Sequence, residues 1–364
     1  MRAKVVIAGC ALLVIVGVAV YHHSQRAVPA KPLEQASAAS PPRPRLPAPR
    51  MPVTPPAEPA AESTNLLGRV INGRSSRPSA EQLAAYLQKH HRSAESLLAA
   101  FHATGDPALL REAMEKHPDD PRVAFTAYYR AEPYDSKNPA SPERRQWLEA
   151  LAKAAPDNAL PNYLAAFDSF RAGQTDQAVQ ELFAASQKTK FQDYSREFMQ
   201  NAEEAYLAAG WSDVEAKGQA YYTAPAWSLW DLSQTGTKLA ELAGLYRQGG
   251  DEASAQAVEQ IGLNLSHSLT GLGQGTMWEL DGIGIERSIL RAMDPNSILA
   301  STGQTVQNRL DALNQRKAAL RKLGKQSGEL LPTLSDQDAA RFFDRSKTFG
   351  EEAAVQWLIK TFGK

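Results

Sequence analysis

Cysteine is nearly absent from this chain: Cys10 is the only one among 364 residues, and it lies in an apolar stretch near the start. A single thiol can form no internal disulfide, and the residues that follow it can support no thiolate chemistry. The rest of the chain must therefore fold by burying apolar side chains. A body of about 300 residues is long enough to do so.

Net charge is also absent, because 40 lysines and arginines offset 40 aspartates and glutamates. The balance is uneven along the chain: residues 1–62 hold seven basic residues and three acidic ones, so the remainder is acidic. An acidic body argues against nucleic acid as the main partner. We expect no nucleic-acid partner.

Motifs of catalysis and of cofactor binding are missing as well. The chain contains no Gly-x-Ser-x-Gly and no His-Glu-x-x-His. His90 and His91 with Glu95 place one imidazole and one carboxylate four residues apart on a predicted helix, but zinc needs a further ligand. The Gly-rich stretch 271–275 follows a predicted helix and lacks the nucleotide-binding pattern, so it predicts an inter-helix turn. We expect no catalytic residue, no cofactor and no metal.

One long apolar run is present, the uncharged stretch from Val5 to Tyr21. A membrane span needs about 17 to 25 such residues, so this one is at the short end. Arg2 and Lys4 precede the run, a pattern that suits a signal anchor or a secretory signal peptide with its N-terminus in the cytoplasm. The run predicts an anchor over residues 5–21, with residues 1–4 cytoplasmic.

Two alternatives to a retained anchor stay open. Gly17-Val18-Ala19 offers small residues at which a peptidase could cut, and Ile7-Ala8-Gly9-Cys10 resembles a lipoprotein box whose cysteine falls early in the run. All three interpretations export the body. We therefore expect it in the periplasm or at the surface of a cell, with bacterial origin favoured by the Ala/Pro-rich composition.

Proline is concentrated between Val28 and Glu62, which hold eleven prolines. Such a segment lacks the backbone donors for helix or sheet and has little to bury. Residues 22–78 are therefore predicted to be a disordered linker. At about 3.1 Å per residue, its Pro-rich part would reach on the order of 100 Å when fully extended.

Helical periodicity begins at Ser79, a plausible N-cap with Gln82 three residues later, and continues to the end of the chain. No segment alternates with period two, so no sheet is expected. Short Gly, Pro and Asp/Asn clusters interrupt the pattern, and short loops imply antiparallel neighbouring helices. The sequence predicts an all-α fold built as an antiparallel helix-pair array.

The interruptions have a rhythm, because Gly105 and Gly173 lie 68 residues apart, which is two periods of about 34. The spacing of a large–large–small–aromatic–Gly–Ala skeleton occurs at Leu239, Leu242, Ala243, Tyr246, Gly250 and Ala255. In these residues the chain resembles the tetratricopeptide-repeat family over residues 79–270. The resemblance implies an α-solenoid that binds a protein or peptide. An irregular helical superhelix is the alternative, since Leu239 and Ala243 replace the family's Trp and Gly.

The last stretch, residues 271–364, is predicted to be a helical capping region. Val306, Leu310, Leu313, Lys317 and Leu320 recur at alternating four- and three-residue spacing, which predicts a long closing helix that packs on the body. A dimer-forming or partner-facing helix is the alternative interpretation. A final helix around Trp357 is expected to cap the array.

One aromatic cluster is a candidate partner-binding surface. Tyr221, Tyr222, Trp227 and Trp230 lie close together in the sequence, on either side of Pro225. Aromatic side chains of this kind anchor interfaces and can stack on sugar rings. Filling the core of the helical array is the alternative role for the same residues.

Two functions remain compatible with these observations. The first is a membrane-tethered scaffold or adaptor that binds a protein or peptide outside the cytoplasm through its helical-repeat surface. The second is an exported cell-wall or polysaccharide-binding protein or enzyme, which would require acidic residues that converge in a groove with perturbed pKa values. The absence of a catalytic motif favours the first, and the oligomeric state stays open.

Overall fold

The computed structural model describes residues 70, 77–131, 139–224, 226–271 and 275–363. Every regular element in these residues is helical, so the prediction of an all-α body is confirmed. The predicted anchor at residues 5–21 and nearly all of the predicted linker lie outside the described residues. In the described ranges, no helix combines the length and the apolar character that a membrane crossing requires.

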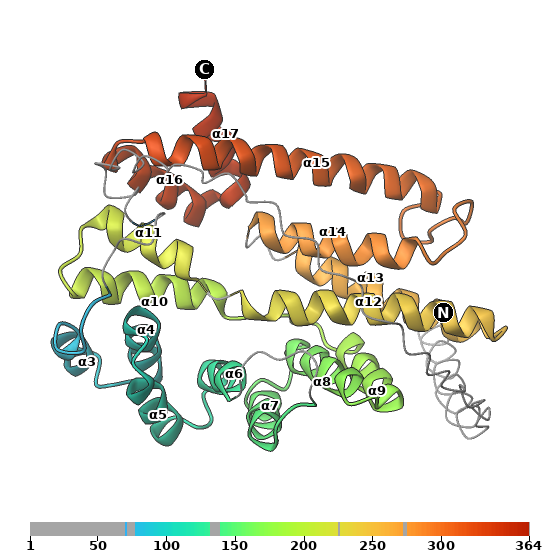
Figure 1. Ribbon diagram of the computed structural model, residues 1–364, viewed down its shortest axis with the longest axis horizontal. Helices are drawn as coiled ribbons and strands as arrows, with labels where there is room; N and C mark the ends of the chain where they lie inside the picture. The colour runs from blue at the N-terminus through green and yellow to red at the C-terminus, as the bar shows by residue number, and fades with distance from the viewer. Residues whose placement is uncertain (1–69, 71–76, 132–138, 225, 272–274, 364) are drawn as a thin grey trace, which may run out of the picture. The chain divides into compact units, whose positions relative to one another are not determined.

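The first seven described helices form a row of short helical hairpins, with α4 packed on α5, α6 on α7 and α8 on α9 (Figure 1). Their bounds are α3 (Ala84–Lys89), α4 (Ala94–Thr104), α5 (Pro107–Lys116), α6 (Pro121–Arg130), α7 (Pro142–Ala154), α8 (Leu160–Arg171) and α9 (Thr175–Ser186). The sequence sets where most of them begin. Ser93, Asp106, Asp120 and Ser141 each accept a hydrogen bond from the first turn that follows.

The next five helices cross back over this row. They are α10 (Ser195–Ala208), α11 (Asp213–Thr223), α12 (Trp227–Gln248), α13 (Glu252–Thr270) and α14 (Thr276–Leu290). Helix α10 packs on α4, and α12 packs on α8 (Figure 1). In a regular solenoid each repeat contacts only its neighbours. The body therefore departs from simple stacking, because its second half covers its first.

Helices α12, α13 and α14 approach one another closely at two glycines. A Cβ added to Gly236 would lie 2.7 Å from the side chain of Ile285, and one added to Gly262 would lie 2.5 Å from that of Ile289. Both isoleucines belong to α14 and are buried. Only a residue without a side chain lets α14 pack at this distance.

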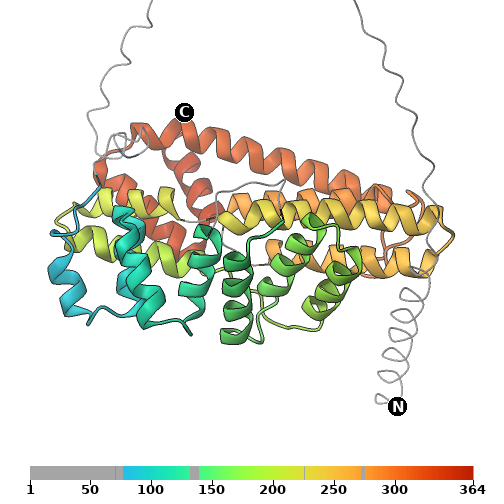
Figure 2. The ribbon, with the colours of Figure 1, turned by 60° about the horizontal axis from the view of Figure 1, so that its bottom comes forward.

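Of the C-terminal helices, α15 packs on α14, α17 packs on α15, and α16 packs on α11 and α17 (Figure 2). They are α15 (Val306–Leu330), the 3₁₀ turn η1 (Leu331–Thr333), α16 (Asp336–Phe349) and α17 (Glu351–Phe362). Val306, Leu313 and Leu320 of α15 are buried, which confirms the predicted long helix packed on the body. Helices α16 and α17 pack with α11 around a second, smaller core that includes Phe342 and Phe343.

Local predictions of turns and caps are confirmed at several positions. Gly173 and Gly250 have φ angles of 72° and 80°, the left-handed conformation that ends a helix, and they join α8 to α9 and α12 to α13. Ser79 and Gln82 exchange the hydrogen bonds of a capping box, although α3 itself begins at Ala84.

Candidate functional site

The four aromatic residues singled out in the sequence have different neighbours in the structure. Trp227 opens α12 half-buried, with its ring centroid 5.5 Å from that of Tyr129, 5.6 Å from that of His102 and 6.1 Å from that of Phe125. The guanidinium of Arg130 lies 5.3 Å from the same ring. This placement is that of a core residue that joins α12 to α4 and α6.

Trp230 lies one turn further along α12 and has different surroundings. Its ring meets Phe167 of α8 edge-on at 5.5 Å, and 37% of the residue stays exposed. Trp227 and Trp230 therefore contact different helices although both belong to α12.

Tyr221 and Tyr222 lie at the end of α11 and face the C-terminal helices. The ring of Tyr221 packs 5.4 Å from Phe343 of α16, and its hydroxyl donates to Glu351 Oε1 at 2.5 Å. Tyr222 packs edge-on against Tyr221 at 5.3 Å and stays 43% exposed. Burial raises the pKa of Tyr222 to about 12, and the charge of Glu351 adds to the shift.

Through Tyr221 and its bond to Glu351, these tyrosines lie beside a cavity of about 200 Å³ that is lined by residues of α13, α14, α16 and α17. Its lining comprises Leu269, Thr270, Gly275, Thr276, Glu279, Phe349, Gly350, Glu351 and Glu352. Glu351 holds the helices together, since its other carboxylate oxygen accepts from the Thr276 backbone N–H at 2.5 Å. We call this cavity, with Tyr222, Met277 and Phe349 around it, the corner site.

The charge of the corner site is negative. Arg316 of α15 bonds Glu279 and Glu352, each at a shortest distance of 2.6 Å. Its hydrogen bonds lower the pKa of Glu352, which keeps that carboxylate ionised. Glu351 adds a third carboxylate to the lining, while Arg316 pairs with the other two and the guanidinium of Arg345 lies 5.2 Å from the ring of Phe349.

Exposed apolar side chains surround this negative cavity. Phe349 is 64% exposed and lines it, and Met277 is 62% exposed and follows the lining residue Thr276. Tyr222 packs on Tyr221, which bonds the lining residue Glu351. Large exposed apolar residues gathered at one place mark interaction surfaces, and aromatics and methionine are enriched in interfaces. The corner site thus combines apolar anchors with negative charge.

Sequence reasoning found Tyr222 but missed Met277 and Phe349. Phe349 ends α16 directly before Gly350, whose φ angle of 89° starts α17 in a new direction. The Phe-Gly pair at a helix junction is a visible signal of a turn. Its exposure, however, depends on how α16 and α17 pack on each other and on α11 and α15.

Two carboxylates with raised pKa values converge near Trp227, but they are buried. Asp168 of α8 and Asp231 of α12 both bond Arg144 of α7 at 3.3 Å, and Tyr129 donates to Asp231 at 3.0 Å. Burial raises the pKa of Asp231 to about 7, against the lowering effect of Arg144. The side chains of Asp168 and Asp231 are 7% and 0% exposed, so a substrate cannot reach this pair.

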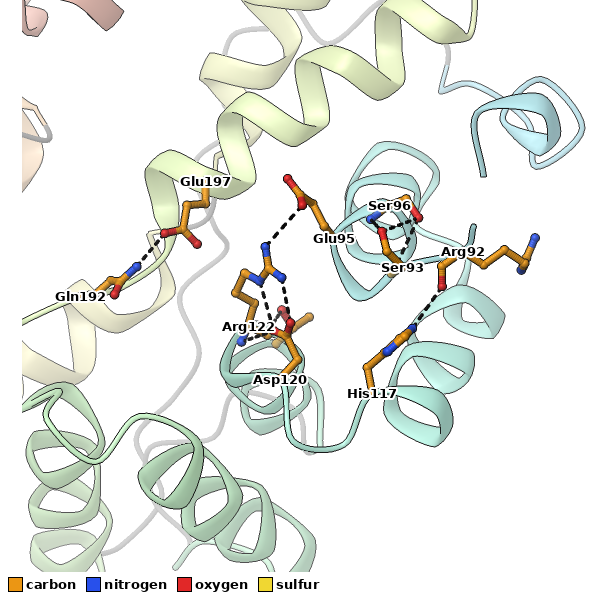
Figure 3. A network of polar contacts seen from close by, with 10 residues as sticks. Arg92, Ser93, Glu95, Ser96, His117, Asp120, Arg122, Gln192 and Glu197 are labelled. Carbon is orange, nitrogen blue, oxygen red and sulfur yellow. Dashed lines mark hydrogen bonds and ion pairs between the residues drawn. The ribbon is translucent and has the colours of Figure 1, made fainter. Parts of the chain in front are cut away.

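A second polar network, partly exposed, lies between α4, α6 and α10 (Figure 3). Arg122 donates to both carboxylate oxygens of Asp120, at 3.1 and 2.8 Å, and lies 3.8 Å from Glu95. Burial alone would raise the pKa of Asp120, but the bonds from Arg122 outweigh it and the pKa is lowered. On α10, Glu197 accepts from Gln192 at 2.6 Å. Arg122 of α6 pairs with Asp120 and lies near Glu95 of α4, so this network is an ion-pair link between α4 and α6.

The expected helical pairing of His90 or His91 with Glu95 is wrong. Helix α3 ends at Lys89, His91 and Arg92 have positive φ angles of 53° and 49°, and Glu95 belongs to α4. Ser93 caps α4 by accepting from the Ser96 N–H, which starts a new helix where the sequence pattern suggested continuity. Over the described ranges, no group of three His, Cys, Asp or Glu side chains could hold a metal ion.

Comparison with known proteins gives no match to this chain among family models, curated proteins or solved structures.

Proposed function

We propose that the chain is a membrane-tethered scaffold outside the cytoplasm, and that its helical body binds a protein partner at the corner site. The observation that carries the proposal is the exposure of Phe349 and Met277, at 64% and 62%, beside a cavity with three carboxylates. Exposing large apolar side chains costs solubility, so their gathering at one cavity favours a binding role.

The side chains of the corner site indicate which kind of partner segment it would bind. Phe349 and Met277 offer area to an apolar side chain, while Glu351, Glu352 and Glu279 favour a lysine or arginine beside it. Aromatic anchors supply most of the energy in such interfaces, and complementary charge increases the association rate. We therefore expect a partner segment with an apolar anchor next to basic residues.

The tether is proposed from the sequence. The apolar run from Val5 to Tyr21 is long enough to cross a bilayer, and the prolines that follow would hold the body away from it. A deletion of residues 5–21 should then release the chain from the membrane fraction on ultracentrifugation. Retention of the shortened chain in that fraction would contradict a tether at this place.

The likeness to tetratricopeptide repeats is kept as part of the proposal. Helical hairpins with a left-handed glycine at the turn, as at Gly173 and Gly250, support it. Helix lengths argue for an irregular variant, because α12 has 22 residues and α8 has 12. The first row is also covered by α10 and α12, which directs the proposed binding to the C-terminal corner.

Proximity labelling in the host of origin tests the proposed function. A labelling enzyme fused after the C-terminus should mark one partner with the natural chain. A chain with Tyr222, Met277 and Phe349 all changed to alanine should lose that partner. Leu245→Ala is the control, since Leu245 is 63% exposed on α12, outside the corner site. Equal labelling by the triple variant and the control would overturn the assignment of the corner site.

A further inference from the structure

A second cavity, of about 380 Å³, opens between the start of α8, the end of α9, the segment that follows α9, and α13. Its lining comprises Ala159, Tyr163, Ala185, Ser186, Lys188, Thr189, Lys190, Phe191, Asn264, His267 and Ser268. None of these residues belongs to the corner site. The volume falls within the roughly 300–1,000 Å³ typical of small-molecule sites.

The walls of this cavity present hydrogen-bond donors and positive charge. Lys188 and Lys190 contribute ammonium groups, and His267 adds an imidazole. Among the described residues that line it, none is an aspartate or a glutamate. An ammonium group is a donor without acceptor capacity, so two of them in one cavity favour an anion.

An aromatic surface accompanies the charges. The ring of Phe191, which is half-buried, lies 6.1 Å from the ring of Tyr163, which is 2% exposed. A half-buried aromatic ring at a cavity wall can contact the apolar face of a ring-shaped ligand. The cavity therefore suits a molecule that has both an anionic group and a ring.

The segment that carries Lys188 and Lys190 is held in place by hydrogen bonds to Asn158 and Ala159. Asn158 is 4% exposed; its amide donates to the Gln192 carbonyl at 2.7 Å, and its side-chain oxygen accepts from the Gln192 N–H at 3.0 Å. The Ala159 N–H donates to the Lys190 carbonyl at 2.8 Å. Lys188, Lys190 and Phe191 are thus positioned before any ligand arrives, which reduces the entropy lost on binding.

Lys188 is the more buried of the two cations. Its ammonium donates to the Asn158 carbonyl at 3.1 Å, and burial lowers its pKa against the opposing effects of Glu181 and Asp157. Lys190 forms an exposed pair with Asp157 at 3.3 Å. A bound anion would give the ammonium of Lys188 a counter-charge from inside the cavity.

We propose that this cavity binds a sugar-sized anionic molecule, with Lys188 and Lys190 on its carboxylate or phosphate and Phe191 against its ring. The site is independent of the corner site and of the tether. If the cavity binds no such molecule, the proposed scaffold function is not affected.

Calorimetric titration of the full chain in detergent at low salt tests the proposal with four probes: glucose 6-phosphate, glucuronate, glucose and inorganic phosphate. We expect one or both anionic sugars to bind with a dissociation constant below about 1 mM. Which of the two binds more tightly distinguishes phosphate from carboxylate as the preferred group. Glucose should bind at least about tenfold more weakly, since it cannot form the charge-assisted bonds.

Substitutions test which side chains contact the ligand. Lys188→Gln with Lys190→Gln should weaken binding of the anionic sugars by roughly tenfold or more. Phe191→Ala should weaken the anionic sugars while leaving inorganic phosphate unchanged. The control is Lys238→Gln with Lys322→Gln, which removes the same charge from exposed positions on α12 and α15. Circular dichroism verifies that each variant is folded.

Three results would overturn the proposal. One is no heat from either anionic sugar at concentrations up to about 10 mM. Another is an equal loss of affinity in the two lysine double variants, which would mark a long-range charge effect. The third is tighter binding of inorganic phosphate than of both sugars, which would remove the role of the ring.

Discussion

The guanidinium of Arg144 in α7 lies 3.3 Å from the carboxylate of Asp231 in α12, a residue 87 positions further along the chain. Both side chains are almost fully buried, at 3% and 0% exposure. The pair joins the first row of helices to the helix that crosses it. Two buried charges so far apart in sequence make this crossing specific, because any other register would leave them unpaired.

Removing Arg144 should therefore destabilise the body. We expect Arg144→Ala to lower the free energy of unfolding by about 3–5 kcal/mol, since it removes the cation that pairs with the buried Asp231 and leaves Asp168 with Arg171 alone. Arg145→Ala, one residue along the same helix and exposed, should change it by less than about 0.5 kcal/mol. Urea unfolding followed by circular dichroism measures both, and equal midpoints would contradict a stabilising role for the pair.

Acid should destabilise the body through His102. Burial, with Arg130 as the second cause, lowers the pKa of His102 from 6.5 to about 3, so the folded state keeps the ring neutral. The buried neutral ring therefore contributes fully to stability above pH 6.5. This contribution is lost as the pH falls from 6.5 toward 3, because the unfolded state then binds a proton that the folded state does not. At pH 4.5, protonation in the unfolded state costs up to about 2–3 kcal/mol of stability.

The check is a comparison of melting temperatures between pH 7 and pH 4.5. His102→Phe keeps the contacts with Phe198 and Trp227 but does not titrate. It should lose less stability on acidification than the natural chain. Identical losses in the two chains would show that His102 does not carry the effect.

The two tryptophans of α12 should respond differently to truncation. Trp227→Ala removes a ring that contacts α4 and α6 and should cost about 3–5 kcal/mol of stability. Trp230 is 37% exposed, so Trp230→Ala should cost about 1 kcal/mol or less. Chemical denaturation of both variants decides the matter: a greater loss from Trp230→Ala would reverse the roles given to the two residues.

Close packing of α13 on α14 should make Gly262 intolerant of a methyl group. Gly262→Ala places a Cβ 2.5 Å from Ile289 and should destabilise the body by about 1–3 kcal/mol. Gly244→Ala, in α12, meets nothing within 4 Å and should stabilise by about 0.5–1 kcal/mol, because alanine favours a helix. The same sign of change at both positions would contradict the packing described.

Much of the local structure could be predicted from sequence. The α12–α13 hairpin follows from Leu239, Leu242 and Gly250, because buried spacing and a turn residue act within one short stretch. The start of α16 follows from Ser335, whose hydroxyl accepts from the Asp338 N–H at 3.2 Å. These features depend on local interactions, so they can be recognised from the sequence.

The arrangement of the helices could not be predicted in the same way. Where α12 crosses α8, Asp231 of α12 pairs with Arg144 of α7, and nothing in the sequence marks these two residues as partners. Trp227 and Trp230 are three residues apart, and only the packing of α12 makes one a core residue. The candidate site was found in part, through Tyr222, because Phe349 joins it by tertiary contact alone.

Binding at the corner site is the central claim, and site-specific photocrosslinking in the host of origin tests it most directly. A photoreactive phenylalanine analogue would replace Phe349 in one full-length chain and Leu245 in another, two positions with 64% and 63% exposure. We expect one crosslinked partner from position 349, absent from position 245 and lost when Met277 is changed to alanine. The same crosslinks from both positions, or a crosslink from 349 only to a second copy of the chain, would contradict it.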